Sequence, residues 1–322
     1  MHDATKPPVL SIALALGAVY IVWGSTYLAI HFAIETIPPF TMAGVRFTVA
    51  GWLLYAFVRG RGAPAPTRAH WISSAIVGAL LLAGGNGGVT WAEQRVPSGI
   101  AALIVATVPV WMVLFDWLRP GGPRPTLRVT LGLALGLLGM GLLVAAGQSD
   151  LSAARIDLVG AAVLVGAAIS WAFGSILSRS LDTPTSALQL TAMQMIAGGA
   201  LLLAVGAVTG EPGRLDLAFV TRQSFLALVY LIVFGAWVGY GAYVWLLRST
   251  SAAVVSTYAY VNPAIAVFLG WLFAGEPLDG WMLGAMAVTV AGVALITMPR
   301  RRKGAPIIAP GKGRRAPTRS GP

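Results

Sequence analysis

The sequence contains no cysteine, and this absence removes several kinds of chemistry from consideration. Without thiols the chain has no disulfide framework, no thiolate nucleophile and no cysteine-based metal site. Charged residues are also scarce: they make up 10% of the 322 residues, whereas a soluble domain has about 25%. Hydrophobic residues make up 57%. This composition predicts an all-α membrane protein in which most side chains face lipid or the interior of a helix bundle.

The signatures of membrane enzymes and ATP-driven pumps are absent as well. The chain has no H-E-x-x-H motif and no G-x-x-x-x-G-K-[ST] loop. We therefore expect no enzyme, no cofactor and no metal site. No carboxylate is predicted at mid-depth, because Glu93 lies near the outer end of the third segment and Asp116 near the inner end of the fourth. A mid-membrane Asp or Glu is the usual carrier of a proton or sodium ion, so coupling through one is not expected, nor is a fixed negative charge in a central cavity.

The apolar residues gather in long runs separated by short stretches of Gly, Pro and charge. A membrane-spanning helix needs about 20 mostly apolar residues. Ten segments meet this length, at approximately 10–31, 40–58, 71–91, 97–118, 127–146, 157–178, 185–208, 223–247, 252–274 and 280–298. A short segment, 1–9, precedes them, and a basic tail, 299–322, follows them.

Lys and Arg are concentrated in the loops on one side of these segments. The other side has only Arg95, Arg155, Arg214 and Arg222. By the positive-inside rule, both termini are predicted to be cytoplasmic, which agrees with an even number of spans. The net charge of +11 follows from this topology and the tail. We therefore expect no nucleic-acid partner, and we expect the tail to lie near anionic lipid headgroups.

The two halves of the chain repeat one another. A shift of 148 residues places Trp23 over Trp171 and Arg46 over Gln194, and a shift of 154 places Pro109 over Pro263. Residues 10–146 thus correspond to residues 157–298. Because each half holds five predicted spans, an odd number, the second copy is inverted. We therefore predict ten helices in two inverted five-helix repeats around a central cavity, an arrangement typical of secondary transporters.

The matched prolines and a glycine-rich stretch are candidates for moving parts. A proline inside a helix costs about 3 kcal/mol, and broken helices at membrane depth are tolerated where they line a cavity. We expect bent, gating helices at Pro109 and Pro263, with a static packing kink as the alternative. For Gly84 and Gly88, close helix packing is the favoured interpretation and local flexing is the alternative.

Several short motifs together resemble those of a known family. They are "WGS" (23–25), "RF" (46–47), the proline patterns of the fourth and ninth segments, and "GEP" (275–277). The chain resembles the EamA-type drug/metabolite transporter superfamily, and within it bacterial amino-acid exporters, including those for aromatic amino acids. The resemblance implies export of a small molecule across the inner membrane through a central cavity.

The candidate substrate-binding residues are aromatic or polar and are predicted to lie within the bundle. They are Tyr20, Trp23, Tyr27, Arg46, Asn86, Thr90, Trp111, Trp171, Gln194, Trp237, Tyr240, Tyr258 and Asn262. Aromatic faces suit an apolar side chain, and Arg46 suits a carboxylate, so a zwitterion with an apolar part fits best. The alternatives are packing for the aromatic residues, interhelical hydrogen bonds for the amides, and either snorkelling to the interface or structural pairing for Arg46.

These features predict a secondary transporter of the bacterial inner membrane that exports small metabolites, with amino acids favoured, by alternating access. Its partners would be the substrate and membrane lipid, with no obligate protein partner. Another metabolite or drug-like compound is an alternative substrate. A channel or a scaffold protein is the alternative class, and a channel would normally have a charged or carbonyl filter ring.

Overall fold

The computed structural model describes residues 8–96, 98–147, 157–184, 186–274 and 280–298. The predicted N-terminal segment up to residue 7 and the basic tail 299–322 lie outside the described residues. Within the described residues the chain is helical and has no β-strand. This agrees with the all-α prediction, because a helix satisfies its own backbone hydrogen bonds in lipid.

The first half of the chain forms five helical stretches, two of which are composite. They are α1 (Val9–Ile34), α2 (Pro39–Gly60), the continuous segment α3 (Arg68–Gly78), η1 (Ala79–Gly87) and α4 (Gly88–Ala92), the pair α5 (Ser98–Val105) and α6 (Val108–Leu118), and α7 (Leu127–Gly147).

The second half follows the same order. It comprises α8 (Leu158–Leu177), α9 (Ala187–Val208), the continuous segment α10 (Arg222–Tyr230), η4 (Leu231–Tyr240) and α11 (Gly241–Ser249), the pair α12 (Ala252–Ser256) and α13 (Tyr258–Ala274), and α14 (Gly280–Thr297). Two short 3₁₀ turns, η2 (Glu211–Gly213) and η3 (Leu217–Phe219), connect α9 to α10.

Seven helices in the described part of the chain are long and apolar enough to cross a membrane. They are Val9–Ile34, Pro39–Gly60, Arg68–Ala92, Leu158–Leu177, Ala187–Val208, Arg222–Ser249 and Gly280–Thr297. Two shorter apolar helices, Leu103–Leu118 and Leu127–Leu143, accompany them.

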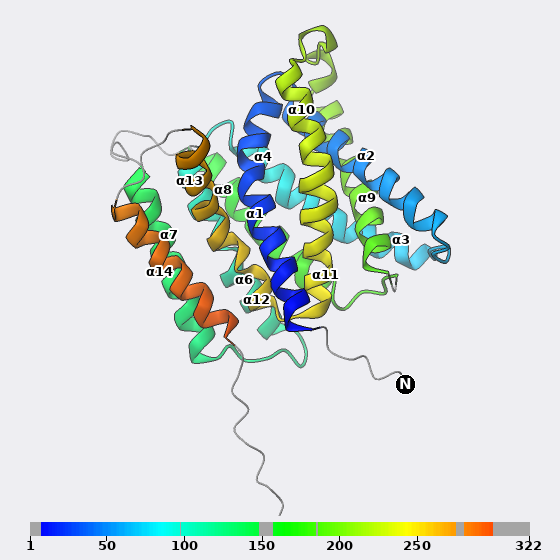
Figure 1. Cartoon of the computed structure of the whole chain (residues 1–322). Helices are drawn as coiled ribbons and strands as arrows, with labels where there is room; N and C mark the ends of the chain where they lie inside the picture. The colour runs from blue at the N-terminus through cyan, green and yellow to red at the C-terminus, as the bar shows by residue number, and fades with distance from the viewer. Residues whose placement is uncertain (1–7, 97, 148–156, 185, 275–279, 299–322) are drawn as a thin grey trace, which may run out of the picture.

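Equivalent helices of the two halves pack against each other. The helix α2 lies along α9, and α7 lies along α14 on the other side of the molecule (Figure 1). Glycine permits both approaches: a Cβ atom on Gly51 would lie 2.8 Å from the backbone nitrogen of Ile196, and one on Gly139 would lie 2.6 Å from that of Thr289. Small residues of this kind let helix backbones come together where lipid provides no hydrophobic driving force.

The third helical stretch of each half contains a π-helical segment, which the sequence did not predict. These segments are η1 and η4, and both are rich in glycine. A π-helix bonds i to i+5 and is often found at functional sites. Its turn is wider than that of an α-helix, so the faces of η1 and η4 differ from those given by a 3.6-residue period.

The two proline-containing stretches are interrupted at different places. The first breaks between α5 and α6, and Pro109 lies in the first turn of α6, where its missing N–H leaves no hydrogen bond unmade. The second breaks at Thr257, between α12 and α13, six residues before Pro263. Pro263 itself lies inside α13. The helix break is therefore adjacent to the proline in the first half but separate from it in the second.

Candidate functional site

A cavity of about 110 Å³ lies among helices of both halves. Eight of the predicted site residues line it: Trp23, Arg46, Asn86, Thr90, Trp171, Tyr240, Tyr258 and Asn262. They come from α1, α2, η1, α4, α8, η4 and α13. Further lining residues that the sequence did not single out for the site include Glu93 and Gly235.

The apolar wall of the cavity is aromatic. Trp23 meets Trp171, its equivalent in the repeat, edge-on with ring centroids 5.7 Å apart, and it meets Tyr258 edge-on at 4.9 Å. Trp171 donates a hydrogen bond from Nε1 to the hydroxyl of Tyr243 at 2.8 Å. Edge-to-face contacts and buried donors with partners hold these rings in fixed orientations. The cavity therefore presents preformed aromatic surfaces.

Arg46 is buried in the wall of this cavity. Its side chain is only 3% exposed, its guanidinium lies 4.7 Å from the centroid of the Phe47 ring, and its Nε has no hydrogen-bond partner. Gly235 makes room for it, because a Cβ there would lie 2.5 Å from Nη2. The alternative that Arg46 snorkels to the interface is wrong, since an interior position of this kind offers no contact with headgroups.

Three further polar residues follow one another along η1 and α4. Thr90 donates a hydrogen bond to the backbone oxygen of Asn86 at 2.9 Å, and the Oδ1 atom of Asn86 is buried without a partner. Glu93, at the C-cap of α4, lines the same cavity. It directly follows the apolar span Arg68–Ala92, and burial raises the pKa of its carboxyl group to about 7.

The expectation of a cavity without fixed negative charge is therefore wrong. Residue counting correctly placed Glu93 near the end of its apolar segment. The cavity, however, extends from the tryptophans to Ile30 and Glu93 near the ends of α1 and α4. No sequence signal gives that extent, because it depends on how neighbouring helices pack.

Two predicted residues, Asn262 and Gln194, make hydrogen bonds to other residues at the cavity. Asn262 lines it and, with its amide oriented to satisfy both groups, donates to the backbone oxygens of Tyr20 and Tyr258 at 3.3 and 3.1 Å. Gln194 is buried behind Tyr240 and accepts its hydroxyl hydrogen bond at 2.8 Å. For these two amides, interhelical hydrogen bonding accounts for the side chain without a ligand.

Three of the remaining aromatic candidates, Tyr20, Trp111 and Trp237, are described and do not line the cavity. Tyr20 is hydrogen-bonded to Thr257 at 2.5 Å, beside the break between α12 and α13. Trp111 donates to Thr107 at 3.1 Å, and Trp237 donates to the backbone oxygen of Ala50 on α2 at 2.8 Å. The side chain of Tyr27 lies outside what the structure describes.

The glycines of η1 and α4 provide close packing against α8. A Cβ on Gly85 would lie 2.8 Å from the ring of Trp171, and one on Gly88 would lie 2.9 Å from the Cβ of Ala167. Gly84 faces Ser170 in the same way. These contacts account for the glycines by packing, and flexing remains a prediction.

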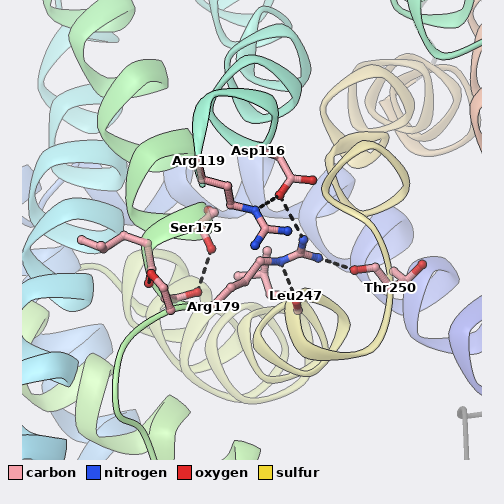
Figure 2. Close-up of polar contacts among 9 residues, drawn as sticks. Asp116, Arg119, Ser175, Arg179, Leu247 and Thr250 are labelled. Carbon is pink, nitrogen blue, oxygen red and sulfur yellow. Dashed lines mark hydrogen bonds and ion pairs between the residues drawn. The ribbon is translucent and has the colours of Figure 1, made fainter. Parts of the chain in front are cut away.

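A second cluster of charged residues ties three elements together at one end of the bundle (Figure 2). Asp116 on α6 is 6% exposed and accepts a hydrogen bond from Arg119 Nε at 2.6 Å. Arg179, just after α8, lies 3.7 Å from the same carboxylate oxygen and donates to the backbone oxygens of Leu247, at 2.9 Å, and Thr250. The cluster therefore links the first half of the chain to two elements of the second.

Comparison with known proteins assigns both halves of the chain to one family. The EamA-like transporter family matches residues 9–145 and 158–298. The "Uncharacterized inner membrane transporter YedA" of Escherichia coli is 41% identical over 298 residues, covering 92% of this chain and 94% of the relative.

More distant relatives cover similar lengths. The "Uncharacterized transporter YvbV" of Bacillus subtilis is 27% identical over 93% of this chain and 96% of its own length. Protein PecM of Dickeya dadantii is 27% identical over 89% of this chain and 93% of its own length. A crystal structure with 22% identity matches the fold with a TM-score of 0.72, covering 92% of this chain and 100% of the other.

The apolar helices, the buried cavity and the names of these relatives identify a membrane transporter. The chain belongs to the EamA-like transporter family, within the drug/metabolite transporter superfamily, as its sequence motifs predicted.

Proposed function

We propose that the chain is a secondary transporter that exports small metabolites, with amino acids as the favoured substrates, across the bacterial inner membrane by alternating access. The observation that carries the substrate class is Arg46, a buried guanidinium whose Nε has no partner among the described residues, in the same cavity as the paired rings of Trp23 and Trp171. A buried charge is stable only when paired, so the cavity suits a ligand with a carboxylate and an apolar part. Another metabolite or drug-like compound with these groups is the alternative.

The proposed architecture is ten spans in two inverted repeats, at 10–146 and 157–298. Two matched features support it: a π-helical segment in the third stretch of each half, and the packing of equivalent helices α2 with α9 and α7 with α14. The concentration of Lys and Arg on one side supports cytoplasmic termini. The direction, export, rests on the resemblance to exporters within the family.

Alternating access requires that one end of the cavity close while the other opens. In this proposal the cluster of Asp116, Arg119 and Arg179 holds the cytoplasmic end closed. The broken helices containing Pro109 and Pro263 are the candidate moving elements, since the breaks leave α6 and α13 free to tilt relative to α5 and α12.

The test is counterflow of radiolabelled aromatic, aliphatic and polar amino acids into proteoliposomes preloaded with the unlabelled compound, without an ion gradient. We expect accumulation by the wild type and its loss in the Trp23→Ala, Trp171→Ala double variant. The matched control is Trp52→Ala, which removes a tryptophan that is 53% exposed and does not line the cavity. If no amino acid accumulates above empty liposomes, the amino-acid assignment is overturned.

A further inference from the structure

The polar face of η1 and α4 offers the cavity hydrogen-bond acceptors. Asn86, Thr90 and Glu93 follow one another along η1 and α4, and all three line the cavity, so together they form one polar face toward it. The Thr90 hydroxyl already donates a hydrogen bond to the Asn86 backbone oxygen at 2.9 Å. It can therefore act toward a ligand only as an acceptor. The Asn86 Oδ1 atom is a buried acceptor without a donor, and Glu93 adds a carboxylate.

Arg46 supplies hydrogen-bond donors and a positive charge to the same cavity. A guanidinium has donors only, and its Nε is left unpartnered. Among the lining residues that the structure describes, Arg46 and Glu93 are the charged ones, and they do not form an ion pair with each other. The cavity therefore contains a cationic donor and an anionic acceptor, and neither has a counterpart among the described residues.

We propose that Asn86, Thr90 and Glu93 form the subsite for a primary ammonium group, so that the substrate is a zwitterion held by this face at one group and by Arg46 at its carboxylate. This inference rests on the proposed function and names the second polar group of its substrate. A substrate with a carboxylate alone would leave Glu93 and Asn86 without donors. A substrate with an amine alone would leave Arg46 without an acceptor, and unsatisfied buried groups are unfavourable.

The test is competition in the same counterflow assay. The labelled probe is the amino acid that the wild type carries best, and the competitors are its analogues without the amine and without the carboxylate (for phenylalanine, 3-phenylpropanoate and phenethylamine). We expect each analogue to compete at least about tenfold more weakly than the amino acid, since a hydrogen bond to a charged group is typically worth that much. In Glu93→Gln, the amino acid should bind about tenfold more weakly and lose its advantage over the analogue without the amine.

The control variant is Glu35→Gln, which removes the same charge from an exposed carboxylate at the C-cap of α1. It should behave as the wild type. Size-exclusion profiles and tryptophan fluorescence identify variants that fail to fold, and Glu93→Asp, which keeps the carboxylate, should retain part of the preference for the amine.

The two possible failures are distinguishable. If the wild type carries amino acids but the analogue without the amine competes equally, or Glu93→Gln keeps the wild-type preference, the ammonium subsite is overturned while the proposed function stands. If the wild type carries no amino acid, the substrate assignment fails and this inference fails with it.

Discussion

Arg46 is a positive charge held inside the bundle without a described counter-ion. Its only described aromatic contact is the Phe47 ring, 4.7 Å away, which gives weak stabilisation compared with an ion pair. A buried charge of this kind attracts an anionic group more strongly than it would at the surface, because the protein interior screens charges less than water does. We therefore expect Arg46 to recognise the carboxylate of a substrate.

We expect Glu93 to make substrate binding depend on pH. Its pKa is raised to about 7 because burial disfavours the charged form, so the carboxyl group is mostly protonated at pH 6 and mostly ionised at pH 8. Only the ionised form attracts an ammonium group. We expect the apparent affinity for the amino acid to rise about tenfold from pH 6 to pH 8, following the ionised fraction.

Among the described residues, Arg46 lines the same cavity as Glu93, and Arg95, two residues after Glu93 in the chain, is paired with Asp157, with 3.5 Å between Nη1 and Oδ2. Groups of these types keep their charge between pH 6 and pH 8. The measurement is the half-saturating concentration in counterflow at matched internal and external pH. Glu93→Gln should give a flat profile, and a profile in that variant as steep as the wild type would assign the titration to another group.

At the scale of elements, the structure distinguishes the two ends of the bundle. The cavity reaches the ends of α1 and α4, where Ile30 and Glu93 line it. At the other end, Asp116 connects α6 to Arg179, and Arg179 bonds to the backbone at the end of α11 (Figure 2). A buried carboxylate with two arginine partners resists separation, since removing one partner leaves a buried charge unpaired.

We expect Asp116→Asn to open this end of the bundle more often. The reporter is Val244→Cys on α11, a residue that is buried in the described core. Because the natural chain has no cysteine, a thiol reagent labels only the introduced residue. Labelling by a thiol reagent from the cytoplasmic side should accelerate at least about tenfold, which corresponds to a shift of roughly 1.4 kcal/mol in the closed–open equilibrium.

The matched control is Asp182→Asn, which removes a carboxylate paired with His70 at 3.6 Å but 70% exposed. Exposed pairs contribute little, so labelling should stay at the wild-type rate. Equal labelling in Asp116→Asn and in the wild type would exclude the cluster as the closure of this end.

The π-helical segments explain why some aromatic residues were misplaced at this scale. From the sequence, both Trp237 and Tyr240 were candidates for the site. In η4, however, Tyr240 lines the cavity, while Trp237 donates to the backbone of α2. Nothing in the local sequence marks a change to i+5 hydrogen bonding, because the glycines of η4 are equally compatible with close α-helix packing.

At the scale of the whole molecule, the proposed topology makes a direct prediction. A single cysteine introduced in a loop reports on which side of the membrane that loop lies. The positions are Gly213 in the loop between α9 and α10, Ala65 in the loop between α2 and α3, and Ser320 in the tail. We expect a membrane-impermeant maleimide to label Gly213→Cys in intact spheroplasts, and to label the other two only after lysis. Labelling of Ala65→Cys or Ser320→Cys before lysis would contradict cytoplasmic termini.

Much of the architecture follows from the sequence. Scarce charge and long apolar runs predicted an all-helical membrane protein, and the short motifs predicted the family. The match of Trp23 with Trp171 by sequence shift is reflected in a direct contact between their rings. These features are predictable because the need to satisfy backbone hydrogen bonds in lipid restricts a spanning segment to a narrow range of length and composition.

The site itself was decided by tertiary packing. Arg46 was recognised as a polar residue within the bundle and Glu93 as a carboxylate near a segment end, yet which of them borders a cavity depends on how α1, α2, α4 and α8 meet. The sequence alone therefore determined a helical membrane transporter with two related halves. Only the three-dimensional structure placed a guanidinium, a carboxylate and two tryptophans around one cavity, because these contacts join residues far apart in the chain and carry no local periodicity.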